Sequence, residues 1–259
     1  MPVLNFHMVL AILGIALTGG ILGLDRTAAG QFMLSQPIVA GPLTGWLLGD
    51  PTAGIVIGAT LELIWVLDLP IGTFVPANAT VETVSATAIA ALGSPGGASL
   101  PVIGFSIVLT MALVPITMKA DGLVRQWNSR LADAAFAESE GPGGSVLARI
   151  QYAGIALFFL KSFVLYILFL PIGIAAIALF GQLPDVFQRA LSLFVRLLPI
   201  VGVALVVSKL SVKTLDQYFL FGFACAAVAG QLFHAPAFAV LLLTTAAGWL
   251  GARLSDGKS

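Results

Sequence analysis

A single carboxylate interrupts a long apolar stretch in the first third of the chain. Glu62 lies within the run Ile55–Leu67, whose other members are apolar or small apart from Thr60. An ionised carboxylate is costly inside a lipid bilayer, so it must face a cavity, pair with a cation or be protonated. Because carboxylates accept charge-assisted hydrogen bonds from hydroxyl groups, Glu62 is a candidate ligand for a polar, hydroxyl-bearing solute. The alternative is a structural partner for a neighbouring helix.

Five other charged residues stand at breaks in the apolar stretches or deep inside one. We favour helix capping or placement at the membrane interface for four of them, Asp25, Asp50, Asp68 and Glu82. Arg196 instead lies about nine residues into the apolar segment 187–208, where it can pair with a carboxylate such as Glu62, snorkel or face another subunit. An Arg facing lipid at that depth is unfavourable by at least about 2.5 kcal/mol, so we expect protein around it.

The sequence offers no convincing group for phosphoryl transfer or metal binding. Its two histidines, His7 and His234, lie before the first apolar segment and in a tight turn near the end. The single cysteine, Cys225, stands in an apolar segment, where a thiol is usually an inert packing residue. We therefore expect neither a metal nor a cofactor, and no catalytic residue in this chain.

The composition shows what kind of elements must position these residues. Of 259 residues, 59% are hydrophobic and only 9% are charged, against about 25% in an ordinary soluble domain. That excludes a soluble enzyme and a disordered regulator. The 12 basic residues are matched by 12 acidic ones, so no basic field exists to attract nucleic acid. The remaining class is a membrane protein with several spans.

The apolar segments predict an all-α polytopic membrane protein with about eight or nine segments. They read as 7–24, 32–49, 51–68, 71–93, 98–118, 151–181, 187–208, 217–233 and 236–252. In the N-terminal half the joints are short, and residues 72–82 are too polar to cross lipid as a plain helix. Irregular backbone is tolerated in a membrane only where protein or a cavity covers it. We therefore favour broken or re-entrant segments there over ordinary spans with tight turns.

A hydrophilic stretch, 119–150, separates an N-terminal membrane region, 1–118, from C-terminal membrane helices, 151–259. Within this stretch an apolar residue recurs at every fourth position: Leu123, Trp127 and Leu131. Such a stripe suits an amphipathic helix that lies on a membrane or against a partner, and a plain surface helix is the alternative.

The distribution of Lys and Arg predicts the orientation in the membrane. These residues cluster in 119–150, at Lys209 and Lys213, and at Arg253 and Lys258, with a pair of spans between successive clusters. All three clusters should be cytoplasmic, which places the C-terminus inside and the N-terminus outside. Lys161 fits this scheme if it snorkels at the interface.

Small residues at four-residue spacing form two smooth faces, one at Gly41, Gly45 and Gly49 and one at Gly54 and Gly58, that let helices approach closely. The run 45–62 combines them with Asp50 and with Thr60-Leu61-Glu62. It resembles the signature of the IIC subunit of the mannose/fructose/sorbose class of the bacterial phosphoenolpyruvate-dependent sugar phosphotransferase system. Residues 36–42, 71–72, 198–202 and 218–223 look like the same family.

The resemblance implies a subunit of the bacterial inner membrane that binds a hexose or amino sugar and passes it inward. Phosphorylation would be done by separate cytosolic IIB and IIA proteins, and a IID membrane subunit would complete an oligomeric permease. It also implies that sugar is bound by Glu62 and Thr60, with Asn78 and Asp68 as further candidates. The signature residues Gly45, Gly49, Asp50, Gly54 and Gly58 would serve packing.

This chain departs from the family pattern at Ala59, at Asn78 where an Asp is usual, and at Arg196 where a glycine is usual. Two rival functions stay open on the residues alone. One is a transporter of another small polar solute without coupling to phosphorylation. The other is a membrane scaffold or sensor that transports nothing.

Overall fold

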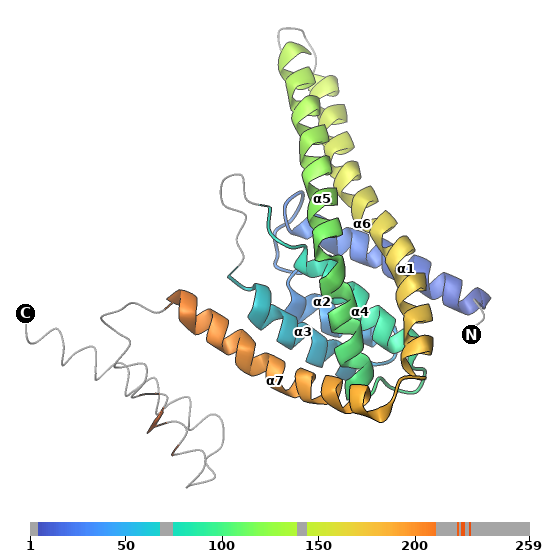
Figure 1. Cartoon of the computed structure of the whole chain (residues 1–259). Coiled ribbons are helices and arrows are strands. Elements are labelled where there is room, and N and C mark those ends of the chain that lie inside the picture. The colour runs from blue at the N-terminus through green and yellow to red at the C-terminus, as the bar shows by residue number, and fades with distance from the viewer. Residues whose placement is uncertain are drawn as a thin grey trace, which may run out of the picture. The chain divides into compact units, whose positions relative to one another are not determined.

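The computed structural model describes residues 5–67, 75–138 and 144–210, together with the isolated residues 222, 224, 225 and 228. The chain divides into two units, Met1–Val206 and Val207–Ser259. The first unit holds nearly all of the described residues. Seven helices and no strand make up the described ranges (Figure 1). They are α1 (Phe6–Asp25), α2 (Pro37–Leu47), α3 (Pro51–Trp65), α4 (Ala79–Gly93), α5 (Leu100–Glu138), α6 (Gly144–Phe180) and α7 (Asp185–Leu210).

The all-helical prediction is confirmed, but the expected eight or nine apolar segments are not found. Within the described residues four helices, α1, α5, α6 and α7, are long and apolar enough to cross a membrane. The helices α2, α3 and α4 have 11, 15 and 15 residues. A helix of 15 residues is about 22 Å long, which is less than the ~30 Å of a hydrocarbon core. The apolar segments 217–233 and 236–252 lie outside the described residues.

Local sequence signals explain where the short helices begin. Asp50 caps α3, because its Oδ1 accepts a hydrogen bond from the Ala53 amide at 3.0 Å, and Pro51 fills the first helical position. Asn78 caps α4 in the same way, accepting from the Val81 amide at 3.2 Å. Between α2 and α3, Gly49 has a φ of 80°, a left-handed conformation that favours glycine.

The helices α2 and α3 pack against each other through backbone rather than side chains. A Cβ added to Gly41 would lie 2.5 Å from the Gly54 carbonyl oxygen, and one added to Gly45 would lie 2.5 Å from that of Asp50. A Cβ on Gly58 would meet the Pro37 carbonyl oxygen at 2.5 Å. Only glycine allows this approach, so Gly41, Gly45, Gly54 and Gly58 hold the α2–α3 hairpin closed. The packing role expected for Gly49 is wrong, because an added Cβ there would have nothing within 4 Å and the residue instead forms the turn.

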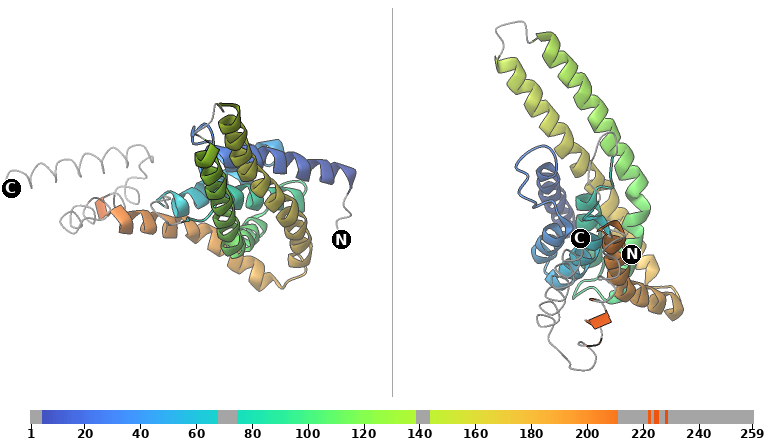
Figure 2. Two further views of the ribbon diagram at one scale, coloured as in Figure 1. Left: turned by 90° about the horizontal axis from the view of Figure 1, so that it is seen from above. Right: turned by 90° about the vertical axis from the view of Figure 1, so that its left-hand side faces the viewer.

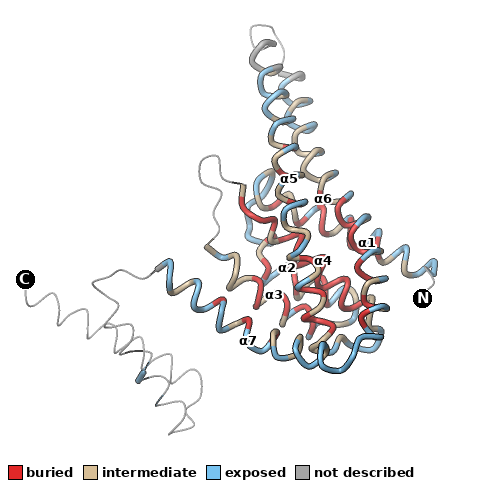
Figure 3. Tube along the Cα trace, in the orientation of Figure 1, coloured by how far each residue is buried: buried red, intermediate tan, exposed pale blue. Residues whose placement is uncertain are grey.

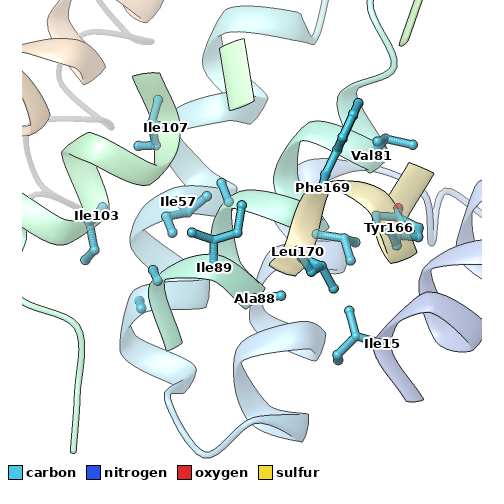
Figure 4. Close-up of a cluster of buried hydrophobic side chains, with 14 of the residues drawn as sticks. Ile15, Ile57, Val81, Ala88, Ile89, Ile103, Ile107, Tyr166, Phe169 and Leu170 are labelled. Carbon is cyan, nitrogen blue, oxygen red and sulfur yellow. The ribbon is translucent and has the colours of Figure 1, made fainter. Parts of the chain in front are cut away.

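The helix α4 lies at the centre of the unit and contacts α1, α2, α3, α5 and α6. Ile89 of α4 packs in one apolar cluster with Ile57 of α3 and Ile107 of α5, while Leu170 and Tyr166 come from α6 (Figure 4). These side chains are almost completely buried, and the surrounding backbone is correspondingly buried along α4 (Figure 3). A short helix that is covered on every side needs no lipid contact.

The helices α5 and α6 run side by side and extend beyond the short helices, as two further views confirm (Figure 2). No helix ends at residue 118 or begins at 151, because α5 continues to Glu138 and α6 begins at Gly144. On α5, Leu123 and Trp127 are each 56% exposed.

Candidate functional site

Five polar side chains of α4 are buried in the centre of the unit, and sequence reasoning did not single them out as a group. They are Thr80, Glu82, Thr83, Ser85 and Thr87. The hydroxyl groups of Thr83, Ser85 and Thr87 have no hydrogen-bond partner among the described residues. Burying a hydroxyl without a partner is unfavourable, and such groups in a native protein call for an explanation. The sequence feature that could have indicated this group is the polar character of residues 79–87 within the predicted apolar segment 71–93.

Glu82 lies within the first turn of α4 and is 1% exposed. Its Oε1 accepts a hydrogen bond from the Thr117 hydroxyl of α5 at 3.0 Å. The expectation that Glu82 caps a helix or lies at an interface is therefore wrong. The helix is capped four residues earlier by Asn78, which places Glu82 on a buried face.

A polar cavity of about 360 Å³ lies beside the N-terminus of α4. Its walls come from the end of α1, the α1–α2 loop, the end of α3 and the start of α4: Asp25, Arg26, Gln31, Met33, Ser35, Gln36, Trp65, Val66, Ala79 and Thr80. The volume lies within the range of about 300–1,000 Å³ that is usual for small-molecule sites. Trp65 lines the cavity, and its indole Nε1 is buried without a hydrogen-bond partner among the described residues, which is unusual for a native protein.

Asp25 holds the loop that forms one wall of this cavity. Its two carboxylate oxygens accept hydrogen bonds from the amides of Phe32 (2.6 Å) and Ser35 (3.1 Å). Between these anchors Gln31 and Met33 both have left-handed backbone conformations, with φ of 58° and 65°. Such conformations are costly for residues other than glycine and persist only where the surroundings enforce them. Asp25 thus shapes a strained loop instead of capping α1.

Glu62 lies near this cavity but does not line it. Its Oε2 accepts a hydrogen bond from the Ile38 amide at 3.2 Å, at the first turn of α2. Gln36, which precedes α2 and lines the cavity, is two residues away from Ile38. The Thr60 hydroxyl donates to the Val56 carbonyl of its own helix at 2.6 Å and is buried. Asp68 lies outside the described residues.

Asn78 belongs to a charged network between α1, α4, α5 and α6. Its Nδ2 donates to Asp121 at 3.1 Å, and Asp121 also forms an ion pair with Lys161. Arg26 donates to the Ala77 carbonyl at 2.8 Å beside them. The cavity that these residues line is only about 10 Å³, which is room for about one water molecule. Asn78 and Glu62 are therefore not brought into one cavity.

Lys161 does not snorkel as expected, because its side chain is 7% exposed and meets Asp121 of α5. No local pattern indicated this pair, because the two residues are 40 positions apart. Arg196 is exposed on α7 and makes no hydrogen bond or ion pair with any described residue, Glu62 included.

Four apolar helices of spanning length, packed with three short helices of which α4 is buried, define a polytopic membrane protein. The sequence profile of a family described as "PTS system sorbose-specific iic component" matches residues 8–248. The chain belongs to this family. It is accordingly a IIC component of a sugar permease of the phosphotransferase system, in the mannose/sorbose class.

Named relatives agree with this assignment, and a solved structure shares the fold. The mannose-specific EIIC component of Escherichia coli K12 is 26% identical over 202 residues, covering 76% of this chain and 73% of the relative. The fructose permease IIC component of Bacillus subtilis is 24% identical over 224 residues, covering 86% and 79%. A solved chain titled "Structure of membrane protein" has the same fold, with a TM-score of 0.74, 20% identity and coverage of 96% of both chains.

Proposed function

We propose that this chain binds a hexose or amino sugar in the polar cavity beside α4 and passes it inward for phosphorylation by a separate IIB protein. The observation that carries the proposal is the cavity itself, whose volume of about 360 Å³ accommodates a monosaccharide. Its lining includes two residues with carboxamide groups, Gln31 and Gln36, and the aromatic residue Trp65. Sugars are bound by such planar polar groups together with an aromatic face.

Glu62 does not line the cavity, and we propose that it acts beside it, as a charged hydrogen-bond acceptor for a sugar that extends toward the α2 N-terminus. Its Oε2 is engaged by the Ile38 amide, and its Oε1 has no partner among the described residues. A sugar hydroxyl reaching the α2 N-terminus would donate to that oxygen. Thr60, Asn78 and Asp68 remain proposed contributors to sugar binding. The polar groups of Thr60 and Asn78 are already hydrogen-bonded in this structure, so these two residues would contribute by holding α3 and α4 in position.

Beyond the cavity, the unpaired hydroxyls of Thr83 and Thr87 lie on the same face of α4 as Thr80, whereas that of Ser85 lies on the opposite face. A sugar that leaves the cavity past Thr80 would exchange hydrogen bonds with Thr83 and Thr87 once the helices packed over them move apart. The short helices α2–α4 enter the membrane region without spanning it, and the α5–α6 turn faces the cytoplasm, where IIB and IIA act. A IID subunit completes the permease in the bacterial inner membrane.

Coupling to phosphorylation is tested in sealed inside-out membrane vesicles. Vesicles that contain this chain and the IID protein encoded beside it are loaded with radiolabelled sugar. Purified IIA, IIB and the general phosphocarrier proteins are then added with phosphoenolpyruvate. Sugar phosphate should form outside the vesicles only when all components are present. Release of unmodified sugar at the same rate without phosphoenolpyruvate would favour the uncoupled transporter, and no release under any condition would favour the scaffold.

A further inference from the structure

The helix α7 carries two stripes of opposite character. Its buried stripe consists of Leu191, Val195, Leu198 and Gly202. This stripe faces the rest of the unit: a Cβ added to Gly104 of α5 would lie 2.8 Å from the Leu191 carbonyl oxygen, and one added to Gly202 would lie 2.6 Å from Leu63 of α3. Spacings of four, three and four residues keep these positions on one side of a helix.

The opposite stripe has the same spacing and is exposed: Arg189, Leu193, Arg196 and Ile200. Leu193 and Ile200 are 57% and 65% exposed, and Figure 3 shows the outer side of α7 as exposed along its length. We name these four residues the α7 stripe. Only 17% of the apolar window of α7 is buried, the smallest share of the four long helices.

Arg196 makes lipid an unsuitable cover for this stripe. It lies near the midpoint of α7, so its guanidinium belongs to the centre of a span, where a charge needs a partner. The described carboxylates of the unit that are buried or part-buried already accept hydrogen bonds, namely Asp25, Asp50, Glu62, Glu82 and Asp121. Residues 217–252, which hold the two C-terminal apolar segments, contain no Asp or Glu.

A second copy of α7 does not supply a negatively charged partner for Arg196 either. Copies of one membrane protein have the same orientation in the bilayer, so two α7 helices related by a two-fold axis would run parallel, and each position of the stripe would lie beside its own equivalent. Such a pair would bring the two Arg196 side chains together. Like charges in a medium of low dielectric constant repel strongly.

We infer that the α7 stripe binds a membrane-spanning helix of a different polypeptide, which carries an Asp or Glu at mid-membrane depth opposite Arg196. This inference rests on the proposed function only because it expects a second membrane subunit. Beyond that function, it names the α7 stripe as the surface that binds the subunit and an Arg196–carboxylate ion pair as the contact. The carboxylate pairs with Arg196 through two parallel hydrogen bonds, while Leu193 and Ile200 pack against the apolar neighbours of that carboxylate.

The test is site-specific photo-crosslinking in intact cells that express the full chain with its neighbouring genes. A benzophenone amino acid is placed at Ile200 in the stripe and, as a matched control, at Ile172, an apolar residue of α6 that is 63% exposed. Ile200 should crosslink to one distinct polypeptide at a helix that contains an Asp or Glu. The yield should fall about tenfold in Arg196→Gln and be retained in Arg196→Lys. Crosslinking at Ile172 should not change.

A second variant pair tests the charge contact directly. Arg196→Glu should abolish the adduct, and replacing the partner's carboxylate by Lys should restore it. An adduct with a second copy, with residues 211–259 or with lipid alone would overturn the inference, as would an equal yield in Arg196→Gln. If Arg196→Gln does not insert, the identity of the adduct in the unmodified chain still decides. Sugar binding measured in the same membranes separates a failure of this inference from a failure of the proposed function.

Discussion

At the scale of single residues, the carboxylates of this protein hold backbone in place as much as they offer charge. Asp25, Asp50 and Glu62 each accept hydrogen bonds from backbone amides at the start of a helix or loop. The second oxygen of Asp50 accepts from the Ala98 amide at 2.7 Å, which ties the α2–α3 turn to the α4–α5 connection. Only Glu62 among these three keeps an oxygen without a described partner, which is why we assign it to the sugar.

Replacing Glu62 separates its two contacts. Losing a charged hydrogen-bond partner typically costs about 1.5–3 kcal/mol, so Glu62→Ala should weaken sugar binding by roughly 10- to 150-fold. Glu62→Gln keeps an oxygen that can accept a hydrogen bond from the Ile38 amide, so its effect on sugar affinity should report the loss of the negative charge alone. Asp133→Ala removes an exposed carboxylate of α5 as the control. Titration calorimetry in detergent measures the affinities. A folded Glu62→Ala protein with unchanged affinity would refute the assignment and leave a structural role.

The buried pair between Asp121 and Lys161 gives a prediction on stability. Removing one member leaves an uncompensated buried charge, which typically costs about 3–5 kcal/mol. Asp121→Asn should therefore lower the thermal unfolding temperature markedly, and Asp121→Asn combined with Lys161→Met should recover most of the loss. Tryptophan fluorescence during heating in detergent follows the transition. A double variant no more stable than Asp121→Asn would show that the pair is not the source of the effect.

At the scale of elements, features set by neighbouring residues could be predicted from the sequence, whereas features formed by distant segments could not. The break at Asp50-Pro51 marks a real helix start, since capping depends on neighbouring residues only, whereas the cap of α4 at Asn78 lies inside the predicted segment 71–93 and was not expected. The burial of α4 depends on five other helices, and an apolar segment with polar interruptions does not reveal which side faces protein. The cavity is formed by four separate chain segments, so nothing in the sequence around Trp65 or Gln31 indicated that these residues line it. Glu62 could be proposed as a ligand from the sequence because a lone carboxylate in an apolar run is recognisable locally.

Glycine contacts in the α2–α3 hairpin predict a contrast between two substitutions. An added methyl at Gly54 would collide with the Gly41 backbone, so Gly54→Ala should destabilise the protein by about 1–3 kcal/mol. Gly14 lies in α1 with nothing within 4 Å of an added Cβ, so Gly14→Ala should be neutral or stabilise by up to about 1 kcal/mol. Thermal unfolding of both variants checks this. Equal effects would mean that the hairpin is not closely packed in the folded protein.

At the scale of the whole molecule, the family assignment and the fold together describe a permease whose long helices surround short central ones. The prediction of a membrane protein came directly from composition, because 24 charged side chains (12 basic and 12 acidic) cannot cover a soluble chain of this size. Within the described residues only four of the apolar segments are long enough as helices to cross a membrane, and an apolar run does not reveal by itself whether its helix spans the bilayer. Length alone separates the two kinds of helix: 11 and 15 residues for the short helices against 20 for α1.

The orientation in the membrane is predicted from the Lys and Arg clusters. In a Cys225→Ser background, single cysteines at Val3 and Ser139 are exposed to an impermeant thiol reagent on intact cells. We expect labelling at residue 3 and none at residue 139, because the clusters place 119–150 in the cytoplasm. Labelling at 139 alone would invert the topology.

The central claim is that the cavity beside α4 holds the sugar, and sugar binding by two tryptophan variants tests it most directly. Trp65 lines the cavity, whereas Trp46 of α2 is 69% exposed and lines none of the cavities described here. Calorimetry with mannose, fructose, sorbose and the N-acetylated amino sugars should find one that binds the purified protein. Trp65→Leu should weaken that binding at least about tenfold, which corresponds to about 1.4 kcal/mol, and Trp46→Leu should leave it unchanged. Equal affinity in both folded variants, or no binding of any sugar, would contradict the claim.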